Sequence, residues 1–96
     1  MIFFLRICEG DVGNTVKMDK GEAIEFIKTN FDVIDLWESL IKDGTMEDCI
    51  VLDDDRSMVC TFSWEPTKPE QFEVSLDPTW WEESFEFTLT FEEIGA

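Results

Sequence analysis

The last third of the chain alternates apolar and polar side chains with a period of two. In residues 85–93, FEFTLTFEE, the apolar positions are Phe85, Phe87, Leu89 and Phe91, and the positions between them are Glu86, Thr88, Thr90 and Glu92. Successive side chains of a β-strand point to opposite faces of its sheet, so this pattern predicts a strand with one apolar and one acidic face. Residues 72–76, FEVSL, show the same alternation. Strands of this kind need cover on one face only.

Other segments also have the composition of strands, and residues typical of turns separate them. The further predicted strands are residues 1–8 (MIFFLRIC), 15–18 (TVKM), 48–53 (DCIVLD) and 58–64 (MVCTFSW). The Gly-, Pro- and Asp-containing segments 9–14, 54–57, 65–70 and 77–84 are predicted to be turns and loops. Short links between consecutive strands favour antiparallel pairing.

Two short helices are predicted between the N-terminal strands and the later ones. Asp19 and Glu22 have the spacing of a capping box, which opens a helix over residues 19–29. A second apolar set begins at Val33, and at 100° per residue its centre is rotated by roughly 80° from the first set. A single helix would spread these residues around its surface, so we expect a break near residues 29–30.

The second helix is predicted over residues 32–43, with Gly44 at its C-terminal end. Together these elements predict an α+β fold: an antiparallel sheet of four to five strands with the two helices packed on one face. Residues 1–96 are expected to form a single compact acidic domain, because the chain has both a usual domain length and nine Phe and four Trp for a core.

The charge of the chain is its most unusual bulk property. Twenty-three acids and seven bases give a formal net charge of −16. Residues 1–48 contain eleven acids and five bases, net −6, whereas residues 49–96 contain twelve acids and two bases, net −10. Such a charge argues against direct binding of nucleic acid or of an anionic membrane, both of which would be repelled. It favours a basic protein partner or bound cations.

Residues suited to catalysis near neutral pH are scarce. The chain has no His and no Tyr, and no phosphate-binding loop, dinucleotide fingerprint or nucleophile motif occurs. We therefore expect no enzymatic activity, no catalytic residues and no cofactor. Cys8, Cys49 and Cys60 are expected to be small buried residues in strands, and the odd number of thiols fits a reducing, cytoplasmic location.

No metal site is predicted either. Residues 53–57, DDDRS, invite a calcium-loop interpretation, but an EF-hand loop starting at Asp53 would need Gly at position 58 and Glu at position 64. The chain has Met58 and Trp64 there, so a hairpin turn rich in Asp is the simpler interpretation.

The adjacent pair Trp80–Trp81 lies in a predicted loop between two strands. Two neighbouring Trp side chains cannot easily enter the same core, so one interpretation is that one packs while the other covers a strand edge. The other is that the pair offers an exposed aromatic anchor for a partner, since Trp is enriched among binding hot spots.

These features lead to a hypothesis of a small non-enzymatic inhibitor that mimics nucleic acid and occupies the basic surface of a nucleic-acid-binding protein or nuclease. Small phage-borne inhibitors of restriction or CRISPR systems use this strategy in the host cytoplasm, and immunity proteins of toxin nucleases are a variant. The residues expected to contact the partner are Glu73, Asp77, Trp80, Trp81, Glu82, Glu83, Glu86, Glu92 and Glu93. The alternative is a structural or adaptor subunit that assembles through an edge strand and the Trp pair. A metal-dependent hydrolase is a more distant third.

The net charge generates a first prediction. Sixteen net negative charges repel one another in the compact state, and salt screens them over a Debye length of about 10 Å at 0.1 M. We expect the midpoint of urea unfolding, followed by circular dichroism, to rise when NaCl is added. A midpoint that falls or stays constant would show that charge repulsion does not limit the stability of the protein.

Overall fold

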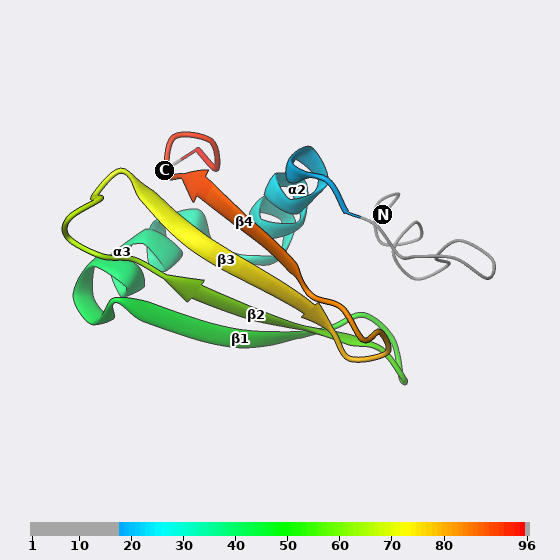
Figure 1. Cartoon of the computed structure of the whole chain (residues 1–96). Coiled ribbons are helices and arrows are strands. Elements are labelled where there is room, and N and C mark those ends of the chain that lie inside the picture. The colour runs from blue at the N-terminus through cyan, green and yellow to red at the C-terminus, as the bar shows by residue number, and fades with distance from the viewer. Residues whose placement is uncertain (1–17, 96) are drawn as a thin grey trace.

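The computed structural model describes residues 18–95, which form two helices followed by four strands (Figure 1). The helices are α2 (Lys20–Asn30) and α3 (Val33–Asp43), and the strands are β1 (Thr45–Val51), β2 (Ser57–Ser63), β3 (Gln71–Pro78) and β4 (Phe85–Thr90). Each strand pairs antiparallel with the next, in the order β1-β2-β3-β4. The predicted α+β fold is confirmed, with four strands in the described sheet.

The start of α2 is the capping box that the sequence indicates. The Asp19 carboxylate accepts a hydrogen bond from the Glu22 backbone N–H at 2.8 Å, and the Glu22 carboxylate accepts one from the Asp19 N–H at 2.9 Å. Reciprocal bonds of this kind satisfy two of the donors that a helix N-terminus leaves unpaired. The helix therefore begins where two short polar side chains can replace the missing carbonyls.

The break between the helices lies at Phe31 and Asp32, one to two residues later than predicted. Asp32 caps α3 by accepting from the Ile34 and Asp35 N–H groups. Phe31 has extended backbone angles, and its ring meets that of Phe62 edge-on, with centroids 5.2 Å apart. The break thus places an aromatic ring against the sheet while α3 starts in a new direction.

The end of α3 follows the sequence closely. Gly44 adopts the left-handed conformation, with φ of 79°, and its N–H donates to the carbonyl of Leu40. A side chain at this position would be strained, which is why Gly is common after the last helical turn. The next residue, Thr45, already belongs to β1, so helix and strand are joined without a loop.

The predicted bounds of two strands need correction. β1 begins at Thr45 instead of residue 48, because the chain enters the ladder directly after Gly44. β3 continues through Pro78, which pairs with Met58. The N–H of Thr79 donates to Ser57 on β2, so the backbone nitrogen and carbonyl of the preceding residue, Pro78, point away from β2. On that side β3 has no partner, because its last pair with β4 is Leu76 with Phe85. A proline fits there because no ladder donor is needed.

The alternation in residues 85–93 also extends beyond the strand that it predicts. β4 ends at Thr90, and residues 91–95 form turns. The Glu93 carboxylate accepts from the Thr90 backbone N–H at 2.8 Å and from its hydroxyl at 3.1 Å, while the Glu93 N–H donates to that hydroxyl. These reciprocal bonds have the pattern of a capping box, here at a turn and not at a helix, and they turn the chain. Glu92 therefore does not lie on the face of the sheet, contrary to the prediction.

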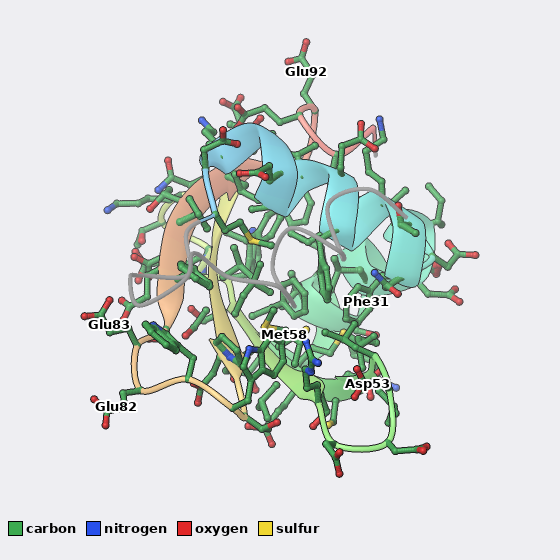
Figure 2. All side chains as sticks on the ribbon, turned by 90° about the vertical axis from the view of Figure 1, so that its right-hand side faces the viewer. Phe31, Asp53, Met58, Glu82, Glu83 and Glu92 are labelled. Atoms are coloured by element: carbon green, nitrogen blue, oxygen red, sulfur yellow. The ribbon has the colours of Figure 1, made fainter. Side chains whose placement is uncertain are left out.

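One face of the sheet is buried together with the apolar sides of the helices. α2 and α3 lie behind the sheet in Figure 1, and the rotated view in Figure 2 agrees. The buried core residues are Met18, Ala23, Phe26, Ile27, Leu36, Leu40, Met58, Cys60, Phe62, Phe72, Val74, Leu76, Leu89, Phe91 and Ile94. On β3 the buried positions alternate strictly with outward ones, as a period of two requires.

The predicted strand at residues 1–8, the turn after it, residues 15–17 of the predicted strand 15–18 and Cys8 lie outside the described residues, and Met18 is not part of a strand. Within residues 18–95, no helix is long and apolar enough to cross a membrane.

The turn after β4 generates a second prediction. The Lys20 ammonium lies 2.8 Å from the Glu93 carboxylate and joins the start of α2 to this turn. Its hydrogen bond, followed by that from the Thr90 backbone, lowers the pKa of Glu93. A lowered pKa gives stability that is present above the unfolded pKa and is lost as the pH falls. We expect Glu93→Gln to lower the melting temperature at pH 7 and the difference to vanish in acid.

Glu92→Gln is the matched control for this measurement, because it changes an exposed neighbouring carboxylate. Its melting temperature should equal or exceed that of the parent. If the two variants behave alike, the tie between Lys20 and Glu93 does not contribute to folding.

Candidate functional site: the open face of the sheet

The face of the sheet that points away from the helices is polar and acidic. We call it the open face. Its side chains follow from the register of the strands: Thr45, Glu47, Cys49 and Val51 on β1, Ser57, Val59, Thr61 and Ser63 on β2, Gln71, Glu73, Ser75 and Asp77 on β3, and Glu86, Thr88 and Thr90 on β4. None of these residues is a base, and the hydroxyl side chains between the acids are short.

Four exposed carboxylates stand on this face: Glu47, Glu73, Asp77 and Glu86. Glu47 and Glu86 share one row across the sheet, because Glu47 pairs with Thr61, Thr61 with Ser75 and Ser75 with Glu86. Three strand spacings of about 4.8 Å place them roughly 14 Å apart. Glu73 is diagonal to Glu86, a relation that corresponds to about 7–8 Å.

A shallow hollow lies between these carboxylates. It is lined by Thr61, Ser63, Glu73, Val74, Ser75, Glu86, Phe87 and Thr88. Short hydroxyl side chains and the carboxylates of Glu73 and Glu86 line it together, so a donor-rich group from a partner can approach the sheet closely. Arg and Lys side chains have this chemistry, because they carry several N–H donors and no acceptor.

The acidic surface continues around one end of the sheet, which we call the hairpin end. The β1–β2 turn and the β3–β4 loop meet there, since alternate turns of an antiparallel meander lie at the same end of the sheet. The Thr79 N–H donates to the Ser57 carbonyl at 3.0 Å, and the Ser57 N–H donates to the Thr79 hydroxyl at 3.1 Å. These bonds fix the two loops side by side.

Carboxylates dominate the hairpin end as they do the open face. Its acids are Asp53, Asp54, Asp55, Asp77, Glu82 and Glu83, all exposed. The Arg56 guanidinium lies 3.3 Å from the Asp53 carboxylate, which partly neutralises the β1–β2 turn. Figure 2 shows Glu82 and Glu83 directed outward from the β3–β4 loop, on the opposite side of this end from Asp53.

The structure gathers five of the nine predicted partner-binding residues into one continuous surface. Glu73, Asp77 and Glu86 lie on the open face, and Glu82 and Glu83 border it at the hairpin end. Glu92 and Glu93 lie in the turn at the other end of β4, and Figure 2 shows Glu92 far from Glu82 and Glu83. Glu93 is in addition held by Lys20 and Thr90.

The remaining two predicted residues, Trp80 and Trp81, are half-buried and pack against the core from the β3–β4 loop. The indole N–H of Trp81 is buried and has no hydrogen-bond acceptor among residues 18–95. Neither ring is fully exposed, so the pair combines the two interpretations drawn from the sequence. Both rings help to position the loop that carries Glu82 and Glu83.

The sequence-based prediction missed Glu47 and did not connect residues 53–55 with this surface. Glu47 fell outside the predicted strand, which was expected to begin at residue 48, whereas β1 starts at Thr45. The position of residues 53–55 follows from topology, because the first and third links of a four-strand meander must lie at the same end of the sheet. The predicted strand order contained this signal.

The cysteines differ from the expectation that all are buried. Cys60 is fully buried on the core side of β2, whereas Cys49 is exposed on the open face of β1. Burial, followed by the nearby charge of Asp48, raises the pKa of Cys60 to about 12. Cys49 points outward because register, and not residue type, decides the direction of a side chain on an edge strand.

Among residues 18–95, no three Cys, Asp or Glu side chains are grouped closely enough to hold a metal ion. Comparison of the chain with protein-family models, with curated proteins and with solved structures finds no match. The candidate site therefore rests on the geometry and charge of the open face and the hairpin end.

The two described cysteines generate a third prediction. In a Cys8→Ser background, an aromatic disulfide reagent should modify Cys49 rapidly and Cys60 only when the protein unfolds. Because the pKa of Cys60 is raised from 9.0 to about 12, the folded state keeps a proton that the unfolded chain releases. The stabilisation is complete below pH 9 and is lost as the pH rises toward 12.

Cys60→Ala separates this effect from the titration of other groups. The variant loses stability at pH 7 through the cavity it creates, but its free energy of unfolding should fall less steeply above pH 9 than that of the parent. Equal slopes for the two proteins would contradict the assignment.

Proposed function

We propose that this protein is a small non-enzymatic inhibitor that presents carboxylates in place of nucleic-acid phosphates to the basic surface of a nucleic-acid-handling protein. The observation that carries the proposal is the open face: it has four exposed carboxylates and no base among its fifteen outward positions on β1–β4. A surface that served solubility alone would more often mix both signs of charge.

The extent of the acidic array supports the proposal. B-DNA carries one phosphate per about 3.4 Å along each strand, and a protein that binds it places Lys and Arg to meet such an array. Neighbouring carboxylates of the open face are separated by about 7–8 Å diagonally and by roughly 13 Å along β3, so the strands alone carry charge at a lower density than one DNA strand. The loop acids of the hairpin end extend the array beyond the strands.

A rigid array has an energetic advantage over a flexible acidic tail. The strands fix the backbone of every carboxylate on the open face, and the Ser57–Thr79 bonds fix the two loops of the hairpin end. Less conformational entropy is then lost on binding. Complementary charge also accelerates association, so inhibition would begin with fast, salt-sensitive encounter.

Two observations favour the inhibitor over an adaptor subunit. Within residues 18–95, β1 and β4 are the edge strands, and on β1 the exposed charge of Asp48 on the core-facing side opposes the addition of another strand. Trp80 and Trp81 pack against the core and are not fully available as anchors. Restriction enzymes, CRISPR effectors and toxin nucleases are the proposed classes of target, in the cytoplasm of the cell that contains them.

The immobilised protein should capture basic nucleic-acid-handling proteins from a bacterial lysate treated with nuclease. These proteins should be retained at low salt and released at high salt, and mass spectrometry identifies them. Addition of duplex DNA should compete with capture, because the proposal places both ligands on the same basic surface.

Substitution on the open face generates a fourth prediction. Glu73→Gln, Asp77→Asn and Glu86→Gln together remove three charges without opening a cavity, because all three side chains are exposed. We expect the affinity for the captured partner to fall by about ten-fold or more and its dependence on salt to become shallower. Titration of the parent and the variant at several NaCl concentrations measures both effects.

The matched control removes three exposed acids from elsewhere: Glu25→Gln, Asp43→Asn and Glu65→Gln. Its net charge equals that of the open-face variant, so the difference between them reports position alone. Equal affinities and equal salt slopes for the two variants would reject the proposed mimicry.

A further inference from the structure

A second surface, on the helix side of the molecule, is apolar. α3 exposes Ile34, Trp37 and Ile41, whose side chains are 52%, 42% and 41% exposed. Residues at spacings of three and four lie on one side of a helix, so the three form a single line along it. We call this line the α3 stripe. The adjacent side of α3 buries Leu36 and Leu40 in the core.

The α3 stripe is held in place by its neighbours. The Trp37 ring meets the Phe91 ring edge-on, with centroids 6.4 Å apart, and the Phe91 ring in turn packs at a tilt against that of Phe72, with centroids 5.0 Å apart. Trp37 is therefore ordered before any partner arrives, although two-fifths of it remains exposed. A partly exposed Trp with a fixed ring is the type of residue that anchors protein interfaces.

Carboxylates border the α3 stripe. Asp35 and Glu38 are exposed on the polar side of α3, and Glu92 is exposed directly after Phe91, the residue that Trp37 contacts. Within α3 itself, Lys42 is the base, and it lies in the last turn. The stripe thus has an apolar centre and a mainly acidic rim, and Glu92, which the open face does not include, belongs to this rim.

The rim decides between the candidate occupants. In a symmetric pair of α3 helices, the side that carries Asp35 and Glu38 would meet its own copy, and each copy of the chain carries −16. An anionic membrane would be repelled for the same reason. A segment with an apolar face flanked by Lys or Arg complements both the centre and the rim.

The size of the stripe limits what it can hold. A stable interface between two folded proteins uses about 20–30 residues on each side. Three side chains along one short helix fit a peptide-sized segment, such as an amphipathic helix laid against α3.

We propose that the α3 stripe is a second docking site, and that its occupant is a cationic amphipathic segment of a basic protein. α3 lies on the other side of the sheet from the open face (Figure 1). The two surfaces therefore act independently, and the proposal shares with the proposed function only the basic character of the partner. A protein with both surfaces occupied could hold two basic elements at once.

The test uses two synthetic peptides of about 14 residues, roughly 21 Å as a helix. One has an amphipathic pattern of Leu and Lys, and the other has Ser in place of every Leu at the same charge. We expect the parent to bind the Leu/Lys peptide about ten-fold or more tightly than the Ser/Lys peptide, because only the former buries apolar surface. Fluorescence anisotropy of labelled peptides measures both affinities.

The paired variants locate the effect. Ile34→Gln with Ile41→Gln should abolish the preference for the Leu/Lys peptide, whereas Val51→Gln, at a side chain that is 74% exposed on the open face, should retain it. Persistence of the preference in the double variant would overturn the proposal. So would sedimentation that finds the parent dimeric and the double variant monomeric, because a second copy would then be the occupant.

The open-face variant separates this proposal from the proposed function. Glu73→Gln, Asp77→Asn and Glu86→Gln together should keep the preference for the Leu/Lys peptide, and loss of the preference there would also overturn the proposal. If no nucleic-acid-handling partner is captured, the proposed function fails while the peptide preference remains.

Discussion

The burial of alternate side chains of β2, β3 and β4 under the helices is the interaction on which the rest of the structure depends. Phe62, Phe72 and Leu89 point into one core with α2 and α3, and fully burying a side chain of this size stabilises the fold by about 1.5–3 kcal/mol. A slip of one residue in any strand would exchange the two faces of that strand and expose these groups. Burial therefore fixes the register, and the register fixes every outward position of the open face.

The packing of the core does not determine which residue types occupy the outward positions of the open face, so its acidity is a separate property of the sequence. The core does not include the side chains at four exposed positions, so their charge is available for binding a partner: Glu47, Glu73, Asp77 and Glu86. Glu93 shows the contrast: its carboxylate accepts hydrogen bonds from Thr90 and Lys20 and so contributes to folding. Position in the fold, and not residue type, thus separates the acids that hold the protein together from those proposed to bind.

Sequence patterns predicted correctly those features that depend only on residues close together in the chain. The Asp19–Glu22 box, the glycine at position 44 and the alternation in β3 appear in the structure because each depends on neighbouring residues alone. The end of β4 was predicted too late because Thr90 and Glu93 are compatible with an alternating strand and also with a capping-box pattern. In the structure their reciprocal hydrogen bonds form, and the strand ends at Thr90. Glu47 was left out and Cys49 was expected to be buried because pairing with β2 decides where β1 begins and which way its side chains point. That pairing is not visible in the residues of β1 alone. The residues of the α3 stripe belong to the apolar set that begins at Val33, and only the packing of Leu36 and Leu40 shows which side of that helix is buried and which remains exposed.

Equilibrium unfolding of the open-face variant at low ionic strength tests most directly whether the two faces of the sheet have separate roles. Replacing Glu73, Asp77 and Glu86 by their amides removes mutual repulsion and leaves the core unchanged. We expect a free energy of unfolding equal to or greater than that of the parent. A decrease of more than about 1 kcal/mol, beyond the ±0.5 kcal/mol usual for surface substitutions, would show that these acids support the fold and would contradict the separation of roles.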